Sequence, residues 1–370
     1  RMIYYVVFSL LAFLTLVAVG VKGKKQIFIE ILAVVIVVLF QGLRWENGTD
    51  WDSYYGMFMY PSEPVYYNEY GWWLLNDIVR RFSGESYTAM LIVQSALIVF
   101  LNIRFAKYAG LNNITSIIFS CFVGSIFPVR FALASIIIIL GFRHIVDRNF
   151  KKFFLYVIVA STIHIATLLI IPFYFVPRKR FSLAMMLFMY LASIMIGFAS
   201  SSVVSFLDSI NSLLAIGSFD GDIQEKIDGY MYGGIAEYSI RSVLSIILSF
   251  CSGAFFIWLY HYFGNHYFSK ASSVQEEYRN NMYHTLLNLY IFGMYFNRTI
   301  AFAIPYLSRI GILASGGVAM LLLLGIEKKF RNKLQLRLVF IVYIIYRFIL
   351  FNQILHGQYE SLFIPYHSAI

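Results

Sequence analysis

The stretch ILAVVIVVLFQGLRWENGTDWD, residues 31–52, decides how the chain is placed. Its first thirteen residues carry no charge, and the next nine contain one arginine, one glutamate and two aspartates. So abrupt a change is typical of a helix that ends at the surface of a bilayer. The whole chain agrees, because 60% of its 370 residues are hydrophobic and only 13% are charged, too few to cover a water-facing globule. The sequence therefore predicts a polytopic membrane protein.

Most of the apolar runs in the chain have the roughly 17 to 25 residues that a membrane-crossing helix needs. They cover about 3–21, 27–43, 87–106, 114–127, 130–146, 153–176, 182–203, 239–263, 282–297, 304–326 and 335–355. Pro128 separates the fourth run from the fifth, because proline removes a helix hydrogen bond. We expect an all-α fold of about 10 to 11 membrane helices, forming a single transmembrane domain over residues 1–370.

Lysines set the predicted orientation, because cytoplasmic loops collect basic residues. Lys22, Lys24 and Lys25 follow the first run and place that loop inside. The run at 153–176 has basic residues at both ends, so we predict a re-entrant hairpin that turns near residues 161–164; a plain eleven-span chain is the alternative. Both termini then lie outside, with two acidic loops at about 44–86 and 204–238. The net charge of +10 reflects this topology and does not indicate nucleic acid.

Five arginines fall at or near predicted outer helix ends, where few cations are expected: Arg44, Arg130, Arg241, Arg298 and Arg309. A charged side chain in hydrocarbon costs roughly 2.5 to 3.5 kcal/mol, so this set is expected to face a polar cavity. Guanidinium groups fork two hydrogen bonds onto phosphate, which predicts an outer site for an anion such as a diphosphate. The alternative is that each arginine pairs with an acid of the outer loops, as Arg44 could with Glu46 or Asp50.

Asp50 and His164 are candidate acid–base residues. His164 lies in the apolar stretch VASTIHIATLL, and ionisable groups within a membrane often mark a reaction site; a hydrogen bond to a neighbouring helix is the alternative. Asp50 could take a proton from an attacking hydroxyl or hold an arginine in place. Asp50-Trp51-Asp52 matches the D-x-D spacing of some metal-dependent glycosyltransferases, but three-residue patterns recur by chance. We therefore predict no metal and no cofactor.

Several blocks of the chain resemble one family of bacterial envelope proteins. Gly42-Leu43-Arg44, Gly48-Thr49-Asp50 and Tyr54 resemble the G-L-R-x(3)-G-T-D-x(3)-Y signature of the EpsG family, a branch of the Wzy-type polysaccharide polymerases. Further blocks that resemble the family follow in order, at Arg130, 151–153, 160–164, 308–311 and 364–366. The loop at 204–238 has no such match, so specificity for the repeat unit is expected to vary there.

The resemblance implies a metal-independent glycosyltransferase of GT-C-like helical architecture, acting at the outer face of the bacterial cytoplasmic membrane. Its expected substrate is an oligosaccharide repeat on undecaprenyl diphosphate, and its product an O-antigen, capsule or exopolysaccharide. Asp50 is our first choice of base and His164 our second, with Tyr54 and Tyr55 stacking on sugars. The five arginines are expected to bind the diphosphate, Arg44 most directly. A flippase and a chain-length regulator are the expected protein partners.

Two other classes of membrane protein remain open from the residues alone. A transporter or flippase of a lipid-linked anionic glycan would use the same arginines, but the chain shows no internal repeat of the kind such proteins have. A membrane acyltransferase would place a histidine such as His164 at its reaction centre, but gives no part to the acidic loop at 44–86.

Overall fold

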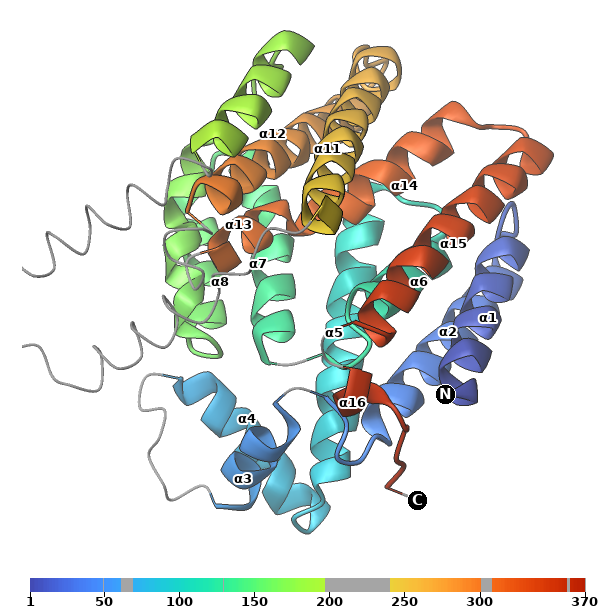
Figure 1. Cartoon of the computed structure of the whole chain (residues 1–370), viewed down its shortest axis with the longest axis vertical. Helices are drawn as coiled ribbons and strands as arrows, with labels where there is room; N and C mark the ends of the chain where they lie inside the picture. The colour runs from blue at the N-terminus through green and yellow to red at the C-terminus, as the bar shows by residue number, and fades with distance from the viewer. Residues whose placement is uncertain are drawn as a thin grey trace, which may run out of the picture. The chain divides into compact units, whose positions relative to one another are not determined.

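The computed structural model describes residues 1–48, 50–60, 69–128, 130–196, 240–300, 308–357 and 360–369. Within these residues the regular structure is helical, with one isolated antiparallel β-bridge between Arg44 and Ser368. The chain divides into two compact units, one formed by residues 1–168 and 319–370 and the other by residues 169–318 (Figure 1). The prediction of a single transmembrane domain is not tested by this division.

The first unit contains the helices α1 (Met2–Val17), α2 (Lys24–Gly42), α3 (Trp51–Met59), α4 (Tyr70–Ser83), α5 (Tyr87–Ala109), α6 (Ile114–Gly124), α7 (Arg130–Val146), α8 (Phe150–Ser161), α14 (Val318–Lys329), α15 (Lys333–Leu355) and α16 (Glu360–Phe363). A 3-10 helix, η1 (Ile165–Phe175), leads into the second unit. That unit holds a helix over Leu183–Ile196, α11 (Ile240–Tyr267), α12 (Val274–Ile300), α13 (Ser308–Ala314) and η3 (Ser315–Gly317).

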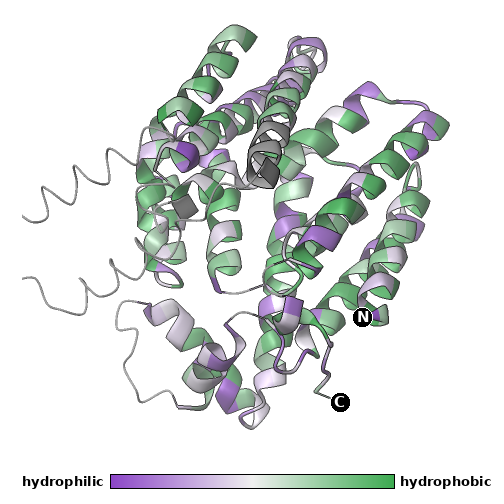
Figure 2. Ribbon diagram, in the orientation of Figure 1, coloured by the Kyte–Doolittle hydropathy of each residue, from purple (hydrophilic) through white to green (hydrophobic). Residues whose placement is uncertain are grey.

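Four helical segments among the described residues are long and apolar enough to cross a membrane: α2, α5, Ile310–Lys329 and α15. Shorter apolar helices cover Met2–Val17, Ile114–Gly124, Ile165–Phe175 and Leu183–Ile196. Figure 2 shows hydrophobic colouring over much of these segments. This composition confirms the predicted class, an all-α polytopic membrane protein.

Helix α2 shows how a uniformly apolar sequence is divided between protein and lipid. Ile29, Ala33, Val37 and Phe40 are buried, at spacings of three or four residues that place them on one face. Ile31, Val35 and Leu39 point away and are exposed. Because exposing so much apolar surface to water is unfavourable, this face is suited to contact the hydrocarbon of a bilayer.

The predicted breaks in the chain are confirmed, and one region contains helices that we did not predict. Helix α6 ends at Gly124 and α7 starts at Arg130, on either side of Pro128. Helix α8 ends at Ser161, where the turn near 161–164 was predicted. The loop at 44–86, in contrast, folds into α3 and α4. The re-entrant hairpin remains a prediction.

Both ends of the chain meet at one end of the first unit. Arg1 forms an ion pair with Glu360 at 3.0 Å, and the Tyr4 hydroxyl donates to the carbonyl of Phe363. Helices α3, α4 and α16 lie at this end, whereas the loop between α1 and α2 lies at the opposite end (Figure 1). The structure thus separates the lysine-bearing loop at 22–25 from the termini, as the predicted topology requires.

Candidate active site

A loop of residues 43–48 follows α2 and is held in place by a distant segment, residues 360–369, which we call the strap. The Trp45 N–H donates to the carbonyl of His367 at 2.9 Å, and the Ala369 N–H donates to the carbonyl of Leu43 at 2.8 Å. The side chain of Asn47 completes the contact, donating to the carbonyl of Pro365 at 2.8 Å and accepting from the His367 N–H at 2.7 Å. The strap is therefore a fixed wall of the loop.

Two glycines of the loop region meet steric demands that other residues would not. A Cβ at Gly42 would lie 2.4 Å from Cγ1 and 2.9 Å from Cα of Ile92, so only glycine lets α2 end so close to α5. Gly48 has φ +112°, a backbone conformation that L side chains rarely adopt, and a Cβ there would lie 3.3 Å from Nη1 of Arg44. Gly42 therefore lets α2 end close against α5, and Gly48 leaves room for the guanidinium of Arg44.

Arg44 is a buried cation, with only 3% of its surface exposed. It donates from Nη2 to the carbonyl of Pro128 at 3.3 Å, and its Cζ lies 4.9 Å from the centroid of the Phe127 ring. No carboxylate among the described residues lies within 4.0 Å of it, so the alternative pairing with Glu46 or Asp50 is not seen there.

Tyrosines surround this cation in place of acids. Burial lowers the pKa of Arg44 to about 10, and the hydroxyls of Tyr87, Tyr366, Tyr4 and Tyr54 act in the opposite direction. Because a pKa near 10 is still well above neutral pH, Arg44 keeps its charge. Burial likewise raises the pKa of Tyr366 to about 12, and its hydroxyl donates to the carbonyl of Phe40 at 2.9 Å. A desolvated cation among neutral hydroxyls is well suited to receive an anion.

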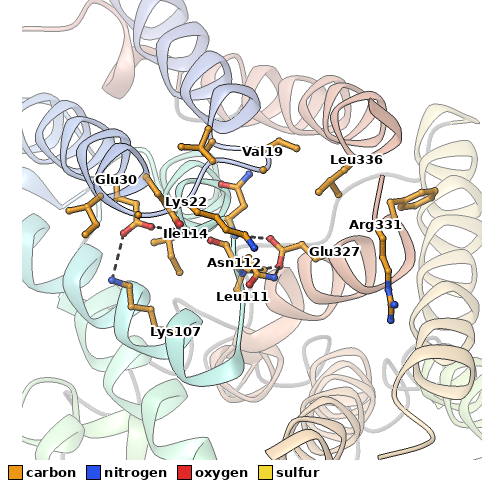
Figure 3. A pocket seen from close by; sticks show the side chains of 18 residues that line it. Val19, Lys22, Glu30, Lys107, Leu111, Asn112, Ile114, Glu327, Arg331 and Leu336 are labelled. Atoms are coloured by element: carbon orange, nitrogen blue, oxygen red, sulfur yellow. Dashed lines mark hydrogen bonds and ion pairs between the residues drawn. The ribbon is translucent and has the colours of Figure 1, made fainter. Parts of the chain in front are cut away.

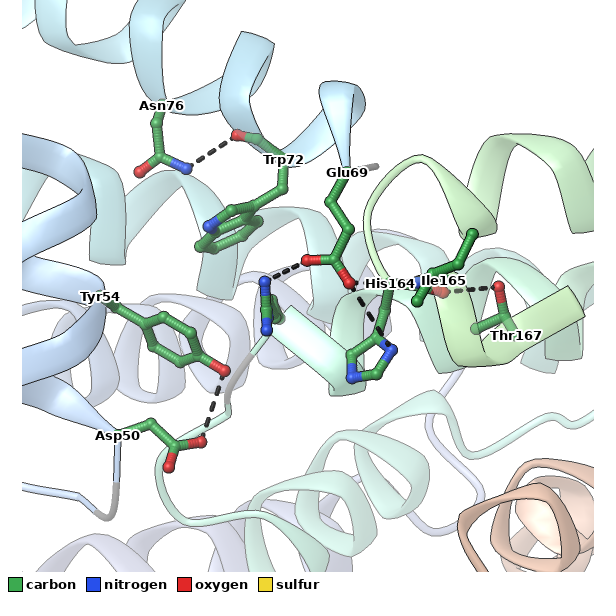
Figure 4. Close-up of polar contacts among 9 residues, drawn as sticks. Asp50, Tyr54, Glu69, Trp72, Asn76, His164, Ile165 and Thr167 are labelled. Carbon is green, nitrogen blue, oxygen red and sulfur yellow. Dashed lines mark hydrogen bonds and ion pairs between the residues drawn. The ribbon is translucent and has the colours of Figure 1, made fainter. Parts of the chain in front are cut away.

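A second cluster joins three elements through Glu69, the residue just before α4. One carboxylate oxygen pairs with Nη1 of Arg130, at the start of α7. The other accepts from the Ile165 N–H at 3.1 Å and lies 4.0 Å from Nδ1 of His164. All three charged or titratable side chains are largely buried, with 6% of Glu69, 12% of Arg130 and 6% of His164 exposed. Figure 4 shows the carboxylate of Glu69 facing the ring of His164.

The turn that carries His164 packs directly on the first residues of α4. The N–H groups of Gly71 and Trp72 donate to the carbonyl of Thr162 at 2.8 Å and 3.1 Å. A Cβ at Gly71 would lie 2.2 Å from Oγ1 of Thr162, so glycine permits this approach. The hydroxyl of Thr167 donates to the carbonyl of His164 at 2.9 Å and fixes the start of η1.

Tyr54 links this cluster to Asp50. Its ring lies 5.6 Å from Cζ of Arg130 and 5.7 Å from the ring of Trp72, and its hydroxyl donates to Asp50 at 3.4 Å (Figure 4). Burial raises the pKa of Tyr54 to about 12, so the hydroxyl keeps its proton at neutral pH. Asp50 itself is exposed at the edge of the cluster.

The two predicted sugar-stacking residues have different surroundings. Tyr54 is 7% exposed and therefore presents little surface to a sugar. Tyr55 is half-buried, stacks on Trp51 at 4.9 Å, and has Trp45 and Tyr87 at its edges. Of the two tyrosines, Tyr55 is therefore the more accessible to a sugar, as part of a cluster with Trp45, Trp51 and Tyr87.

The structure brings Arg44 and Arg130 to the same region, because both lie close enough to Tyr54 to interact with it. Arg298 belongs to the second unit, where its guanidinium lies 4.8 Å from the ring of Tyr190. The side chains of Arg241 and Arg309 lie outside the described residues. Convergence of all five arginines therefore remains a prediction. The described residues contain no group of three or more His, Cys, Asp or Glu side chains that could hold a metal ion.

Glu69, the central acid of this site, was not among the predicted site residues. Glu69 was counted only as one of several acids in the loop at 44–86. For Arg130 the alternative of pairing with a loop acid is the one seen, because folding brings Glu69 to it across a separation of 61 residues. Asn47 was also missed, although it lies within the loop motif. No local pattern identified either contact.

Together, the fold and this site define a multi-pass helical membrane protein with buried cationic and acidic groups at one end of its first unit. The EpsG family matches residues 27–368, nearly the whole chain. The chain therefore belongs to the EpsG family, a family of Wzy-like polysaccharide polymerases. No curated protein and no solved structure matches the chain.

Proposed function

We propose that the protein joins oligosaccharide repeats carried on undecaprenyl diphosphate at the outer face of the cytoplasmic membrane. The growing chain is transferred to a sugar hydroxyl of an incoming repeat, and undecaprenyl diphosphate is released. Membership of a polysaccharide polymerase family supports the general reaction. The observation that carries the proposal is Arg44, a cation that is 3% exposed and has no described carboxylate within 4.0 Å.

The leaving group explains why such a cation is useful. The acceptor hydroxyl oxygen bonds to the anomeric carbon, while the bond from that carbon to the diphosphate oxygen breaks. Its electron pair leaves with the diphosphate, so negative charge grows on the phosphate during the reaction. Arg44 is already desolvated and held by the loop, so it favours that charge without reorganising. Arg130 is the second cation that we assign to the diphosphate, with Arg241, Arg298 and Arg309 as further candidates.

A base must receive the proton of the attacking hydroxyl. Glu69 lies 4.0 Å from Nδ1 of His164, close enough to stabilise the imidazolium that forms when the other ring nitrogen accepts that proton. This contact moves our first choice of base from Asp50 to His164, with Glu69 as the residue that positions it. Asp50 is then assigned to orient the acceptor, together with Tyr54 and Tyr55.

In vitro polymerisation tests the proposal: purified protein is incubated with its undecaprenyl-diphosphate repeat in the presence of EDTA, and the product is separated by length. We expect a ladder from the wild type and none from folded Arg44→Lys, because lysine keeps the charge but loses the two-pronged donor. Arg81→Lys is the matched control, since its side chain is 72% exposed on α4. His164→Ala and Asp50→Asn separate the two candidate bases.

Each failure has a distinct meaning. A folded wild type that makes no ladder from its verified repeat contradicts the polymerase, and loss of the ladder with EDTA contradicts metal independence. In cells that lack the protein, precursor trapped in the inner leaflet would indicate a flippase. Unchanged chain length with altered acetylation would indicate an acyltransferase.

A further inference from the structure

A cavity of about 670 Å³ lies in the first unit where the loops α1–α2 and α5–α6 meet the adjoining ends of α14 and α15 (Figure 3). It belongs to the lysine-bearing end of the unit, away from the strap and Arg44. Nothing in the proposed reaction uses it.

The two acids of the cavity are already engaged by the protein. Glu327 accepts hydrogen bonds from the backbone N–H groups of Asn112 and Asn113 at 2.8 Å and 2.7 Å, and from the side chain of Asn112 at 3.0 Å. Glu30 pairs with Lys107 at 3.6 Å and accepts from Gln26 at 2.9 Å. Both carboxylates therefore hold the walls together and are not free for a cationic ligand.

The cations of the cavity are in the opposite situation. Lys22 and Arg331 line it, are exposed, and have no carboxylate within 4.0 Å among the described residues. Lys333 adds charge nearby, because its stem packs on Gly20, where a Cβ would lie 2.6 Å from Cε of Lys333. Unlike the acids, these cations have no described carboxylate to satisfy them, so the cavity favours an anion.

Much of the remaining lining is apolar, and exposed apolar side chains adjoin it. Val19, Ile27, Ile114 and Leu336 form part of the wall. Ile27 is itself 56% exposed. Phe28, next to Ile27 in the sequence, and Leu334, two residues before Leu336, are each 68% exposed. A ligand with an anionic head and an apolar tail would satisfy both parts of the lining.

We propose that this cavity binds the phosphate headgroup of an anionic phospholipid from the leaflet at this end of the protein, which the lysine pattern predicts to be the cytoplasmic one. Lys22 and Arg331 hold the phosphate, and the glycerol and first methylenes contact Ile27 and Leu336. The site is separate from the polymerase site, so its test does not depend on the proposed reaction.

Native mass spectrometry of the full chain in a neutral detergent tests this proposal. The probes are dioleoyl phosphatidylglycerol and dioleoyl phosphatidylcholine, which share acyl chains, and glycerol 3-phosphate and inorganic phosphate, which carry a phosphate without acyl chains. We expect phosphatidylglycerol to bind at least about tenfold more tightly than the other three. Lys22→Gln with Arg331→Gln should weaken its binding on the order of tenfold or more, because each cation contributes to attraction of an anionic headgroup.

Two matched variants keep the test sharp. Lys24→Gln with Lys25→Gln removes the same charge from the neighbouring helix start without lining the cavity, and should leave binding unchanged. Lys22→Arg with Arg331→Lys changes the same two positions but keeps the charge, and should retain binding. Retained binding would show that the loss in the glutamine variant comes from the missing charge and not from a folding defect. Equal loss in both glutamine variants would overturn the proposal in favour of diffuse attraction. Equal binding of glycerol 3-phosphate and phosphatidylglycerol would overturn the lipid as ligand and leave a soluble phosphate compound.

Discussion

Replacing Glu69 by glutamine removes one negative charge from a nearly dry ion pair and leaves the shape of the side chain almost unchanged. The amide oxygen of glutamine can still accept from the Ile165 N–H, which lies 3.1 Å from the carboxylate oxygen of Glu69 in the wild type. What is lost is the charge that faces Arg130, and both partners are buried, with 6% and 12% of their side chains exposed. Removing one member of a buried pair typically costs about 3 to 5 kcal/mol, because the other charge is left uncompensated.

The lower end, about 3 kcal/mol, is the expected loss of unfolding free energy, because glutamine keeps one hydrogen bond and Arg130 retains some access to water. Glu85→Gln is the matched control. Glu85 pairs with Arg80 at 3.3 Å, but its side chain is 63% exposed, so the same chemical change there should cost less than about 1 kcal/mol.

Denaturation of both variants in the same detergent, followed by tryptophan fluorescence, measures the difference. A double variant, Glu69→Gln with Arg130→Gln, should be less destabilised than the sum of the single changes, since it removes both charges together. Equal stability of the Glu69 and Glu85 variants would refute the reasoning, because the buried pair would then contribute no more than a surface pair. Polymerisation should also fall by about a hundredfold or more, through loss of support for His164.

Three further results are expected. Arg44→Lys should abolish the polymer ladder while leaving the protein folded, as judged by gel filtration. Gly71→Ala should destabilise the protein by roughly 1 to 3 kcal/mol, because its Cβ would lie 2.2 Å from Oγ1 of Thr162, whereas Gly56→Ala, with no neighbour within 4 Å, should be neutral or slightly stabilising in thermal unfolding. Inhibition by inorganic diphosphate should persist near neutral pH and weaken as pH rises through about 10, because burial lowers the pKa of Arg44 to about 10 and the deprotonated side chain no longer attracts the anion.

Local patterns in the sequence were enough to predict the long apolar helices and the positions where they are interrupted. The apolar run at 27–43 predicted α2, and Pro128 predicted the break before α7. Loop helices were harder, because they are short and contain many polar residues. Helix α4 nevertheless buries Trp72, Asn76 and Val79 at spacings of four and three, a helical period that could have revealed it.

The sequence identifies only those residues of the site that are unusual in their own local surroundings. Arg44 and His164 stand out as charged or titratable residues beside apolar runs, and the structure places both in buried surroundings. Glu69 resembles any other loop acid until α4 brings it to Arg130, 61 residues further along the chain. Such pairings depend on tertiary packing, which residue spacing does not encode.

The contact between Asn47 and His367 spans 320 positions of the chain, so a ribosome makes the loop long before it makes the strap that fixes it. During synthesis Arg44 must wait, without its final backbone partners, until α14 and α15 have been inserted. A chain that stalls before α16 therefore carries the loop motif but lacks the strap that orders it, and is expected to be inactive. Formation of the strap is then a late step on which the final geometry of the loop depends.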